Sequence, residues 1–174
     1  MQIIDATKNC EVITSAMQIA EIFRSSLETW HALKRGRETP LWEIDHLMAF
    51  PAELIPYANV TIREPQTGDH RFLFWGSGRA DVMKFDYTNK NLSELKPQLY
   101  GDLVRQELDE TLSARQPIKS SAQVRLDDGT ITKVDKVRFP FVDKNDDAVI
   151  VLSLDDVHQF LKRYYLSWQS CTDG

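Results

Sequence analysis

Cysteine is scarce in this sequence, and its placement excludes the usual metal sites. Among 174 residues only Cys10 and Cys171 occur, near opposite ends, with no Cys-x-x-Cys pair and no grouping with histidine at metal-ligand spacing. We interpret both as the ordinary thiols of a reducing compartment rather than as a disulfide. The sequence therefore predicts no metal site.

Long apolar runs and an excess of basic residues are missing as well. No stretch approaches the ~18 uninterrupted apolar residues that a membrane helix needs, and residues 1–8 lack the basic start and apolar run of a signal peptide. The formal charge is −5, from 21 basic and 26 acidic residues, with no long block of one sign. We therefore predict a cytoplasmic protein that binds neither membrane nor nucleic acid.

Motifs of common catalytic sites are also absent. The sequence has no His-x-x-x-His, no Gly-x-Ser-x-Gly and no phosphate loop, and Gly76-Ser77-Gly78 lacks the spacing of a dinucleotide fingerprint. An enzyme would need two titratable side chains close together inside a pocket. In the strand predicted at residues 130–141, Asp135 is the one acidic residue expected to face inward, and it has no evident partner. We predict no catalytic residue and no enzyme, with a small α+β enzyme as the alternative.

An amphipathic pattern occupies the N-terminal part of the chain and predicts one long helix over residues 11–35. Its apolar residues step by 3, 4, 3, 4 and 3, which is the heptad alternation. Such a stripe either lies on its own domain or forms a dimer, and the prediction is a homodimer through it. The predicted dimer residues are Ile13, Ala16, Ala20, Phe23, Leu27 and Trp30.

Period-two patterns and turn residues predict five strands after this helix, at residues 57–63, 70–75, 118–126, 130–141 and 148–154. A helical segment follows the second strand, and a clear helix spans residues 99–115. A last helix begins at Asp156, with Val157, Leu161, Tyr164 and Trp168 on its apolar side. The expected fold is α+β, a five-stranded antiparallel sheet with a helical lid on one face.

The domain division follows from the same pattern. Residues 1–36 form the N-terminal amphipathic helix, 37–155 the sheet domain, and 156–174 the C-terminal helix and tail. Strand 70–75 is apolar on both faces, so it should be covered on both sides. Phe72 and Phe74 are expected to face the lid, and Leu73 and Trp75 the N-terminal helix or a partner.

This order, a hairpin, a helical middle, a connector helix and a three-strand meander, resembles the PAS fold. The detail over residues 30–155 is similar to the short single-domain PAS proteins common in alphaproteobacteria (the PAS_5 family). Matching pieces are residues 30–37, Pro40, Ile44-Asp45, residues 54–56, Arg71-Phe72 followed by Gly76, residues 91–95, Asp128-Gly129 and the last apolar strand. The chain departs from that family at residues 84–87, where Lys-Phe-Asp-Tyr stands in place of a usual glycine.

The resemblance implies a sensory or regulatory module. In such families the sheet and the helical lid enclose a small-molecule site, and the flanking helices dimerise and transmit a signal. With no output domain in the chain, the effect would pass to a signalling protein partner. A haem-binding member needs a histidine in the helical middle and a flavin photoreceptor needs a cysteine there; residues 79–116 hold neither, so no cofactor is expected.

The expected ligand is a small, mostly apolar or aromatic molecule with one polar end. Alternatives are a filled core in a plain dimeric scaffold and, for Arg79 and Asp81, a simple surface ion pair. The predicted ligand-binding residues are Phe72, Phe74, Arg79, Met83, Phe85, Tyr87, Asp135, Val137 and Phe139.

Overall fold

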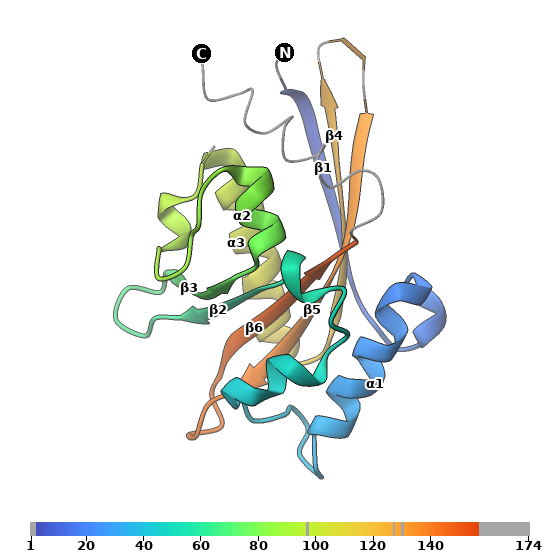
Figure 1. The fold of residues 1–174 in the computed structure, drawn as a ribbon, viewed down its shortest axis with the longest axis vertical. Helices are drawn as coiled ribbons and strands as arrows, with labels where there is room; N and C mark the ends of the chain where they lie inside the picture. The colour runs from blue at the N-terminus through green and yellow to red at the C-terminus, as the bar shows by residue number, and fades with distance from the viewer. Residues whose placement is uncertain (1–2, 97, 127, 130, 157–174) are drawn as a thin grey trace.

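The computed structural model describes residues 3–96, 98–126, 128, 129 and 131–156. Within these ranges six strands form one antiparallel sheet (Figure 1). The strands are β1 (Ile3–Val12), β2 (Asn59–Arg63), β3 (His70–Trp75), β4 (Ile118–Leu126), β5 (Ile131–Val142) and β6 (Ala148–Asp155). The helices are α1 (Arg24–Leu33), α2 (Ser77–Met83) and α3 (Gln98–Ala114), with five 3-10 turns, η1 (Ala16–Gln18), η2 (Glu21–Phe23), η3 (Ile44–Ala49), η4 (Ile55–Tyr57) and η5 (Leu92–Glu94).

The sheet contains the predicted hairpin and meander and one further strand. Its strand order is β1-β4-β5-β6-β2-β3, so the last strand of the meander, β6, pairs with the first strand of the hairpin, β2, and both are internal strands. The expectation of five strands is wrong, because β1 adds to the edge beside β4, with Thr7 opposite Gln123 and Val12 opposite Ile118. Burial alternates along β1 as expected for a strand: Thr7, Asn9 and Glu11 are exposed, while the residues between them are partly buried.

The long N-terminal helix is not present. After β1 the side chain of Ser15 caps η1 and Gln18 completes a capping box, and Ile19 and Ala20 then adopt extended backbone. Helix α1 begins only at Arg24. The break in the helix lets Ile19 reach the same apolar cluster as the residues of α1, which explains why the apolar spacing looked continuous.

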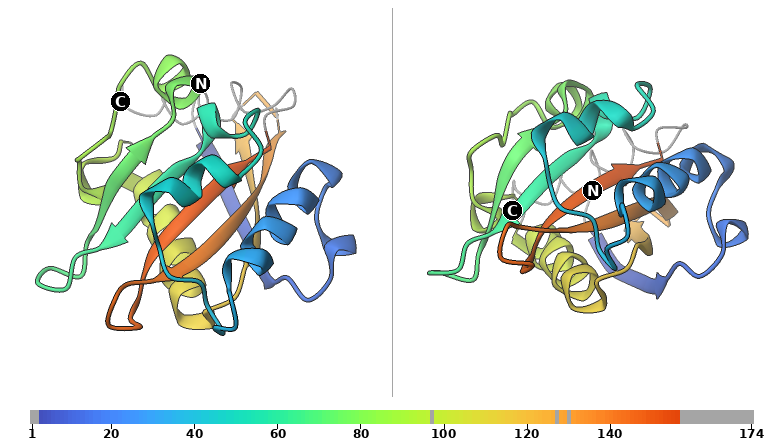
Figure 2. Two further views of the ribbon diagram at one scale, coloured as in Figure 1. Left: turned by 60° about the horizontal axis from the view of Figure 1, so that its bottom comes forward. Right: turned by 90° about the horizontal axis from the view of Figure 1, so that it is seen from below.

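Helical elements cover both faces of the sheet, and β6 shows the division most simply (Figure 2). Its Val151 packs in the cluster beneath α2, η5 and α3, which we call the α3 face. Its Ile150, Leu152 and Leu154 pack in the cluster beneath η2, α1 and η3, which we call the α1 face. The helical lid was expected on one face; α2 and α3 form it, and the N-terminal segment covers the other face.

A bulge in the hairpin changes the faces of β3. Val60 is opposite Phe74 and the next residue, Thr61, is opposite Phe72, so Leu73 is the extra residue. Phe72 therefore lies on the α3 face together with Trp75, whereas Leu73 and Phe74 pack on the α1 face. The prediction that Phe72 and Phe74 share one face, opposite Trp75, is wrong for this reason.

The junction between β3 and α2 is tightly packed. An added Cβ at Gly76 would lie within 3.0 Å of the backbone carbonyl oxygen of Pro56, so only glycine fits there. The strand ends at this glycine and α2 starts at Ser77, as the Gly-x-Gly sequence predicted. The predicted C-terminal helix, with Val157, Leu161, Tyr164 and Trp168, lies outside the described residues. Among the described helices, none combines the length and apolar character required to cross a bilayer.

Candidate functional site: a buried ion network

Glu107 stands at the centre of a buried polar cluster between α3 and the sheet. Its side chain is almost fully buried, on the side of α3 that also presents Val104 and Leu108 to the core. One carboxylate oxygen accepts a hydrogen bond from the Ser120 hydroxyl of β4, and the other accepts one from the Arg138 guanidinium of β5. Sheet and helix are thus joined by charge-assisted hydrogen bonds.

A second cation, Lys136 of β5, completes the surroundings of Glu107. Its Nζ lies 3.9 Å from Oε2 of Glu107 and 5.4 Å from the centre of the Tyr100 ring. Val134, Lys136 and Arg138 are every second residue along β5, so their side chains lie on the same side of the sheet, the α3 face. Both cations are buried, with 1% and 2% of their surface exposed.

The charges of this cluster hold one another ionised. Burial opposes ionisation of Glu107, but the nearby charges of Lys136 and Arg138, with hydrogen bonds from Ser120 and Arg138, outweigh it and lower its pKa from 4.5 to about 2. Burial likewise disfavours the charged Arg138 guanidinium, yet Glu107 and Asp155 raise its pKa. Glu107 is therefore a carboxylate at neutral pH.

Arg79 and Asp155 form the other half of the cluster and join α2 to β6. The Arg79 guanidinium donates to the Asp155 carboxylate through Nη2, and to the carbonyl oxygen of Tyr57 through Nε at 2.6 Å. It also lies over the Trp75 ring, 4.9 Å from the ring centre. Arg138 in turn donates to Ser153 on β6. We call Glu107, Lys136, Arg138, Arg79 and Asp155 the buried ion network.

The donors of the network are cations, so their hydrogen-bonding chemistry suits carboxylates and other anions. Among the described residues the Nε–H of Arg138 is buried and has no hydrogen-bond partner, and an unsatisfied buried donor costs about 1–3 kcal/mol. A further acceptor would find a donor there. No group of three or more His, Cys, Asp or Glu side chains in the described part of the chain could hold a metal ion.

Some of the predicted ligand-binding residues do lie together on the α3 face. Phe72, Met83 and Tyr87 are buried in one cluster with Trp75, and the rings of Phe72 and Tyr87 are 6.1 Å apart. Arg79 reaches the same cluster through its contact with Trp75. This group combines aromatic surface with one end of the ion network.

The other predicted ligand-binding residues lie elsewhere. Val137, Phe139 and Phe74 pack on the α1 face, across the sheet from Phe72. Phe85 is 49% exposed on the surface, and Asp135 accepts a hydrogen bond from Ser121 at 2.5 Å. The nine residues therefore do not line one common cavity, and ligand binding by any of them stays a prediction.

Asp81 and Arg79 do not form the surface pair considered from the sequence. Arg79 is buried and pairs with Asp155, whereas Asp81 is exposed. Asp81 instead borders an open cleft of about 400 Å³ between η4, the end of β3 and α2. The cleft is lined by Ile55, Pro56, Phe74, Trp75, Ser77, Ala80, Asp81 and Asp86.

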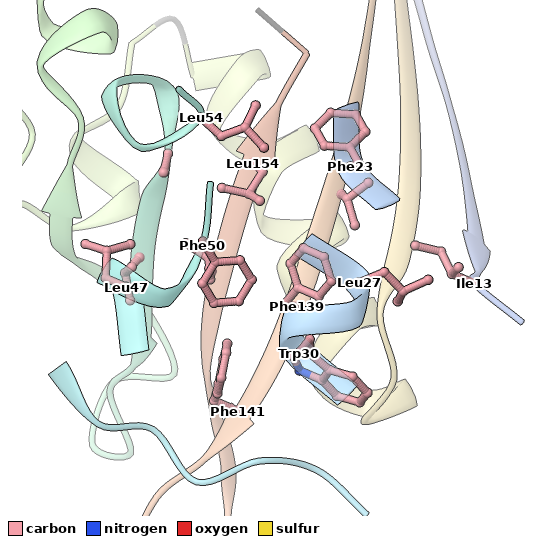
Figure 3. Close-up of a cluster of buried hydrophobic side chains, with 14 of the residues drawn as sticks. Ile13, Phe23, Leu27, Trp30, Leu47, Phe50, Leu54, Phe139, Phe141 and Leu154 are labelled. Carbon is pink, nitrogen blue, oxygen red and sulfur yellow. The ribbon is translucent and has the colours of Figure 1, made fainter. Parts of the chain in front are cut away.

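The predicted dimer residues mostly face their own sheet. Phe23, Leu27 and Trp30 are buried against Phe139 and its neighbours, as Figure 3 shows, and the Trp30 indole nitrogen donates to the carbonyl oxygen of Pro140 at 2.8 Å. Ile13 is buried as well, while Ala16 and Ala20 are exposed. The apolar residues of this segment therefore pack mostly against the sheet of their own chain. The homodimer stays a prediction, and the apolar spacing no longer supports it.

Sequence reasoning missed the ion network. Near the start of α3, Leu99 is 52% exposed, whereas Tyr100 beside it is buried. The buried side runs through Tyr100, Val104, Glu107 and Thr111, steps of four and three residues. The sequence did contain one indication of the network: Glu107 stands at a position where the helical spacing calls for a core residue.

Comparison with known proteins gives neither a family nor a curated relative. No family model matches the sequence, and no curated protein does. Among solved structures, the PAS domain of a protein from Colwellia psychrerythraea is similar at 11% identity, with 64% of this chain and 94% of that chain covered and a TM-score of 0.42.

Light-oxygen-voltage (LOV) domains are similar to a comparable extent. The dark structure of the blue-light photoreceptor Aureochrome1 LOV has 10% identity, coverage of 77% of this chain and 94% of that chain, and a TM-score of 0.42. An RNA-binding light-oxygen-voltage receptor has 8% identity, coverage of 95% of this chain but 42% of that chain, and a TM-score of 0.45. Likeness at this level says nothing about ligands or partners.

Proposed function

We propose that this chain is a PAS-type regulatory module of the short single-domain kind. A small molecule or a partner protein would bind at the α3 face and change how α2 and α3 sit on the sheet, and the segments flanking the sheet would pass the change to another protein. The element order supports this: hairpin, helical segment, connector helix and meander stand in the order on which the PAS resemblance rests.

The observation that carries the proposal is the buried ion network. Three cations and two carboxylates sit where an ordinary core would hold apolar side chains. Replacing such a group by well-packed apolar residues is often neutral or stabilising, so stability alone gives little reason for it. Strongly perturbed ionisable groups gather at functional sites more often than elsewhere.

The contacts of the network would also allow the helical lid, α2 and α3, to shift on the sheet. Arg79 and Glu107 are the points at which α2 and α3 are joined to β4, β5 and β6 by ionic hydrogen bonds. Such bonds are directional and can exchange one anionic partner for another, whereas an interlocked apolar core cannot. An incoming anion that takes over a cation would therefore release the helix that held it.

This chemistry narrows the expected ligand to a small aromatic or apolar acid. The aromatic cluster of Phe72, Trp75 and Tyr87 would take the apolar body. The acid group would compete with Glu107 or Asp155 for Arg138 or Arg79. The same features argue against catalysis, because a carboxylate with a pKa of about 2 that is already held by two cations is a poor general acid or base.

Thermal unfolding with paired ligands tests the proposal. Aromatic carboxylates such as benzoate and naphthoate would be compared with their neutral amides, at equal millimolar concentration. The acids should raise the unfolding midpoint and the amides should not, since only a ligand bound to the folded state stabilises it. Hydrogen exchange of the α3 amides should change in the same samples.

A variant pair sharpens this test. Glu107→Gln removes the competing carboxylate, so it should respond to the acids more strongly than the wild type. Asp102→Asn removes an exposed carboxylate from the same helix and should respond like the wild type. Absence of any acid-specific shift in both the wild type and Glu107→Gln would contradict a small-molecule role for the network.

A further inference from the structure

The two edges of the sheet differ in how their backbone is used. On β3 the outer edge is covered, because Phe72 donates its N–H to the carbonyl oxygen of Lys90 at 2.9 Å and accepts from the N–H of Asn89 at 2.8 Å. On β1, ten residues long, the only strand partner among the described residues is β4 on the inner side. Within the described ranges, the outer edge of β1 therefore has no strand partner along its length.

The outward groups of β1 can be identified from the register. Ile13 donates its N–H to the carbonyl oxygen of Pro117 at 2.9 Å, so Ile13 and Pro117 are a hydrogen-bonded pair. From Val12 back to Asp5 the antiparallel pairing with β4 continues without a shift in register. Opposed residues alternate between bonded and non-bonded pairs, so the peptide groups of Ala6, Lys8 and Cys10 point away from β4. Three evenly spaced donor–acceptor sets form the template that an added strand needs.

Natural edge strands are usually protected by proline, bulges or charged side chains, and β1 has only part of this protection. It contains no proline, and its register shift is confined to the first residues, between Ile3 and Asp5. Its lysine does not guard the edge either, because Lys8 turns toward α3 and pairs with Glu110 at 2.9 Å. A ten-residue edge without proline, and regular from Asp5 to Val12, is a template to which a further strand can add.

An acidic groove runs beside this edge, between β1 and α3. It is open, has a volume of about 580 Å³, and its lining contains three carboxylates and no basic residue. The lining residues are Cys10, Glu11, Val12, Asp109, Glu110, Ser113, Ala114 and Ile118. A strand added to β1 would place every second side chain into it.

Asp109 carries the uncompensated charge of the groove. Glu110 pairs with Lys8, and Lys119 lies 3.9 Å from Glu11. The partner of Asp109 is the Nε2 atom of His70 at 3.0 Å. Burial lowers the pKa of His70 despite the opposing effect of Asp109, so this partner stays neutral at pH 7.

We propose that the edge of β1 binds an extended segment of a partner protein as a seventh strand, with apolar side chains alternating with lysine or arginine. The basic side chain lies over Asp109, and apolar side chains contact Val12 and Ile118. A second copy of this chain fits less well, because antiparallel pairing of two β1 strands would bring two acidic grooves together across the dyad.

Binding of a designed peptide tests this proposal. The probe is a nine-residue capped peptide that alternates valine with lysine or threonine. Two methylated forms carry N-methyl groups either on the amides of one edge or on those of the other, and a further form has glutamate in place of lysine. Fluorescence anisotropy would measure affinity, and hydrogen exchange would locate the contact on β1.

The lysine peptide should bind and slow exchange at the amides of Ala6, Lys8 and Cys10. One methylated form should lose about tenfold or more in affinity, because three hydrogen bonds to β1 are lost, while the other keeps most of its affinity. The glutamate peptide should be weakened to a similar degree. Asp109→Asn should weaken the lysine peptide severalfold, and Asp102→Asn, outside the groove on the same helix, should not.

Three results would overturn the proposal. The lysine peptide could fail to bind at millimolar concentration. Both methylated forms could bind as well as the parent peptide, which would exclude strand addition. The amides of β1 could instead become protected with rising protein concentration in the absence of peptide, which would show that a second copy is the occupant.

Discussion

The two faces of the sheet are filled in different ways. On the α1 face, Phe23 and Trp30 meet Phe139 and Phe141 in a cluster of apolar side chains (Figure 3). On the α3 face an apolar cluster lies beside charges, with Glu107 held between cations. The first arrangement supplies stability without directional demands. The second adds contacts that depend on protonation and on competing ions, so the two faces should respond differently to mutation and to pH.

The largest expected effect comes from removing the central carboxylate. Glu107→Leu leaves Lys136 and Arg138 buried without their shared anion and should reduce the free energy of unfolding by about 4–5 kcal/mol. Replacing all three, with Lys136→Met and Arg138→Leu added, should recover more than half of that loss. Urea unfolding followed by circular dichroism measures both. A triple variant as unstable as the single one would show that the charges contribute net stability.

A slightly smaller effect is expected on the apolar face. Phe139→Ala removes a fully buried ring that contacts Phe50, with ring centres 5.6 Å apart. The loss should be about 3–4 kcal/mol, from transfer of the ring and from the cavity left behind. Because no ionisable group is involved, the loss should be the same at pH 7 and pH 5. A loss that changed by more than about 1 kcal/mol between these pH values would contradict the separation of the two faces.

Acid should act through the α3 face. The pKa of Glu107 is lowered from 4.5 to about 2 on folding, a difference that corresponds to about 3 kcal/mol. The folded-state pKa is the lower one, so this stability is present above about pH 4.5 and is lost as pH falls toward 2. Urea unfolding between pH 6 and pH 2 should show this slope in the wild type and in Phe139→Ala. The slope should shrink in the triple apolar variant, and an unchanged slope there would assign it to other carboxylates.

Regular patterns of local sequence predicted a large part of this fold. The hairpin, the helix now bounded as α3 and the three-strand meander all follow from periodicity and turn residues. The N-terminal helix failed because apolar spacing reports which residues face the core and not whether the backbone between them is continuous. Phe23, Leu27 and Trp30 do face the core, yet the chain before them is extended at Ala20.

The candidate site was less accessible to sequence reasoning, for two physical reasons. The bulge at Leu73 exchanges the faces of Phe74 and Trp75, and an alternation rule cannot detect an inserted residue. The charges of Glu107, Lys136 and Arg138 compensate one another only when α3 lies on β5. Each of them alone resembles a solvated side chain, so their burial becomes evident only from tertiary structure.

The close approach at Gly76 has a consequence for recognising relatives of this chain. Any side chain there would meet the carbonyl oxygen of Pro56, which is backbone and cannot rotate away. At Gly78 the two nearest atoms belong to the Tyr57 ring, a side chain that can move or be exchanged for a smaller one, and the Pro56 carbonyl oxygen is farther away, at 3.0 Å. Divergent members should therefore keep glycine at position 76 while position 78 varies together with position 57. A search that weights those three positions would separate descendants of this fold from chance matches.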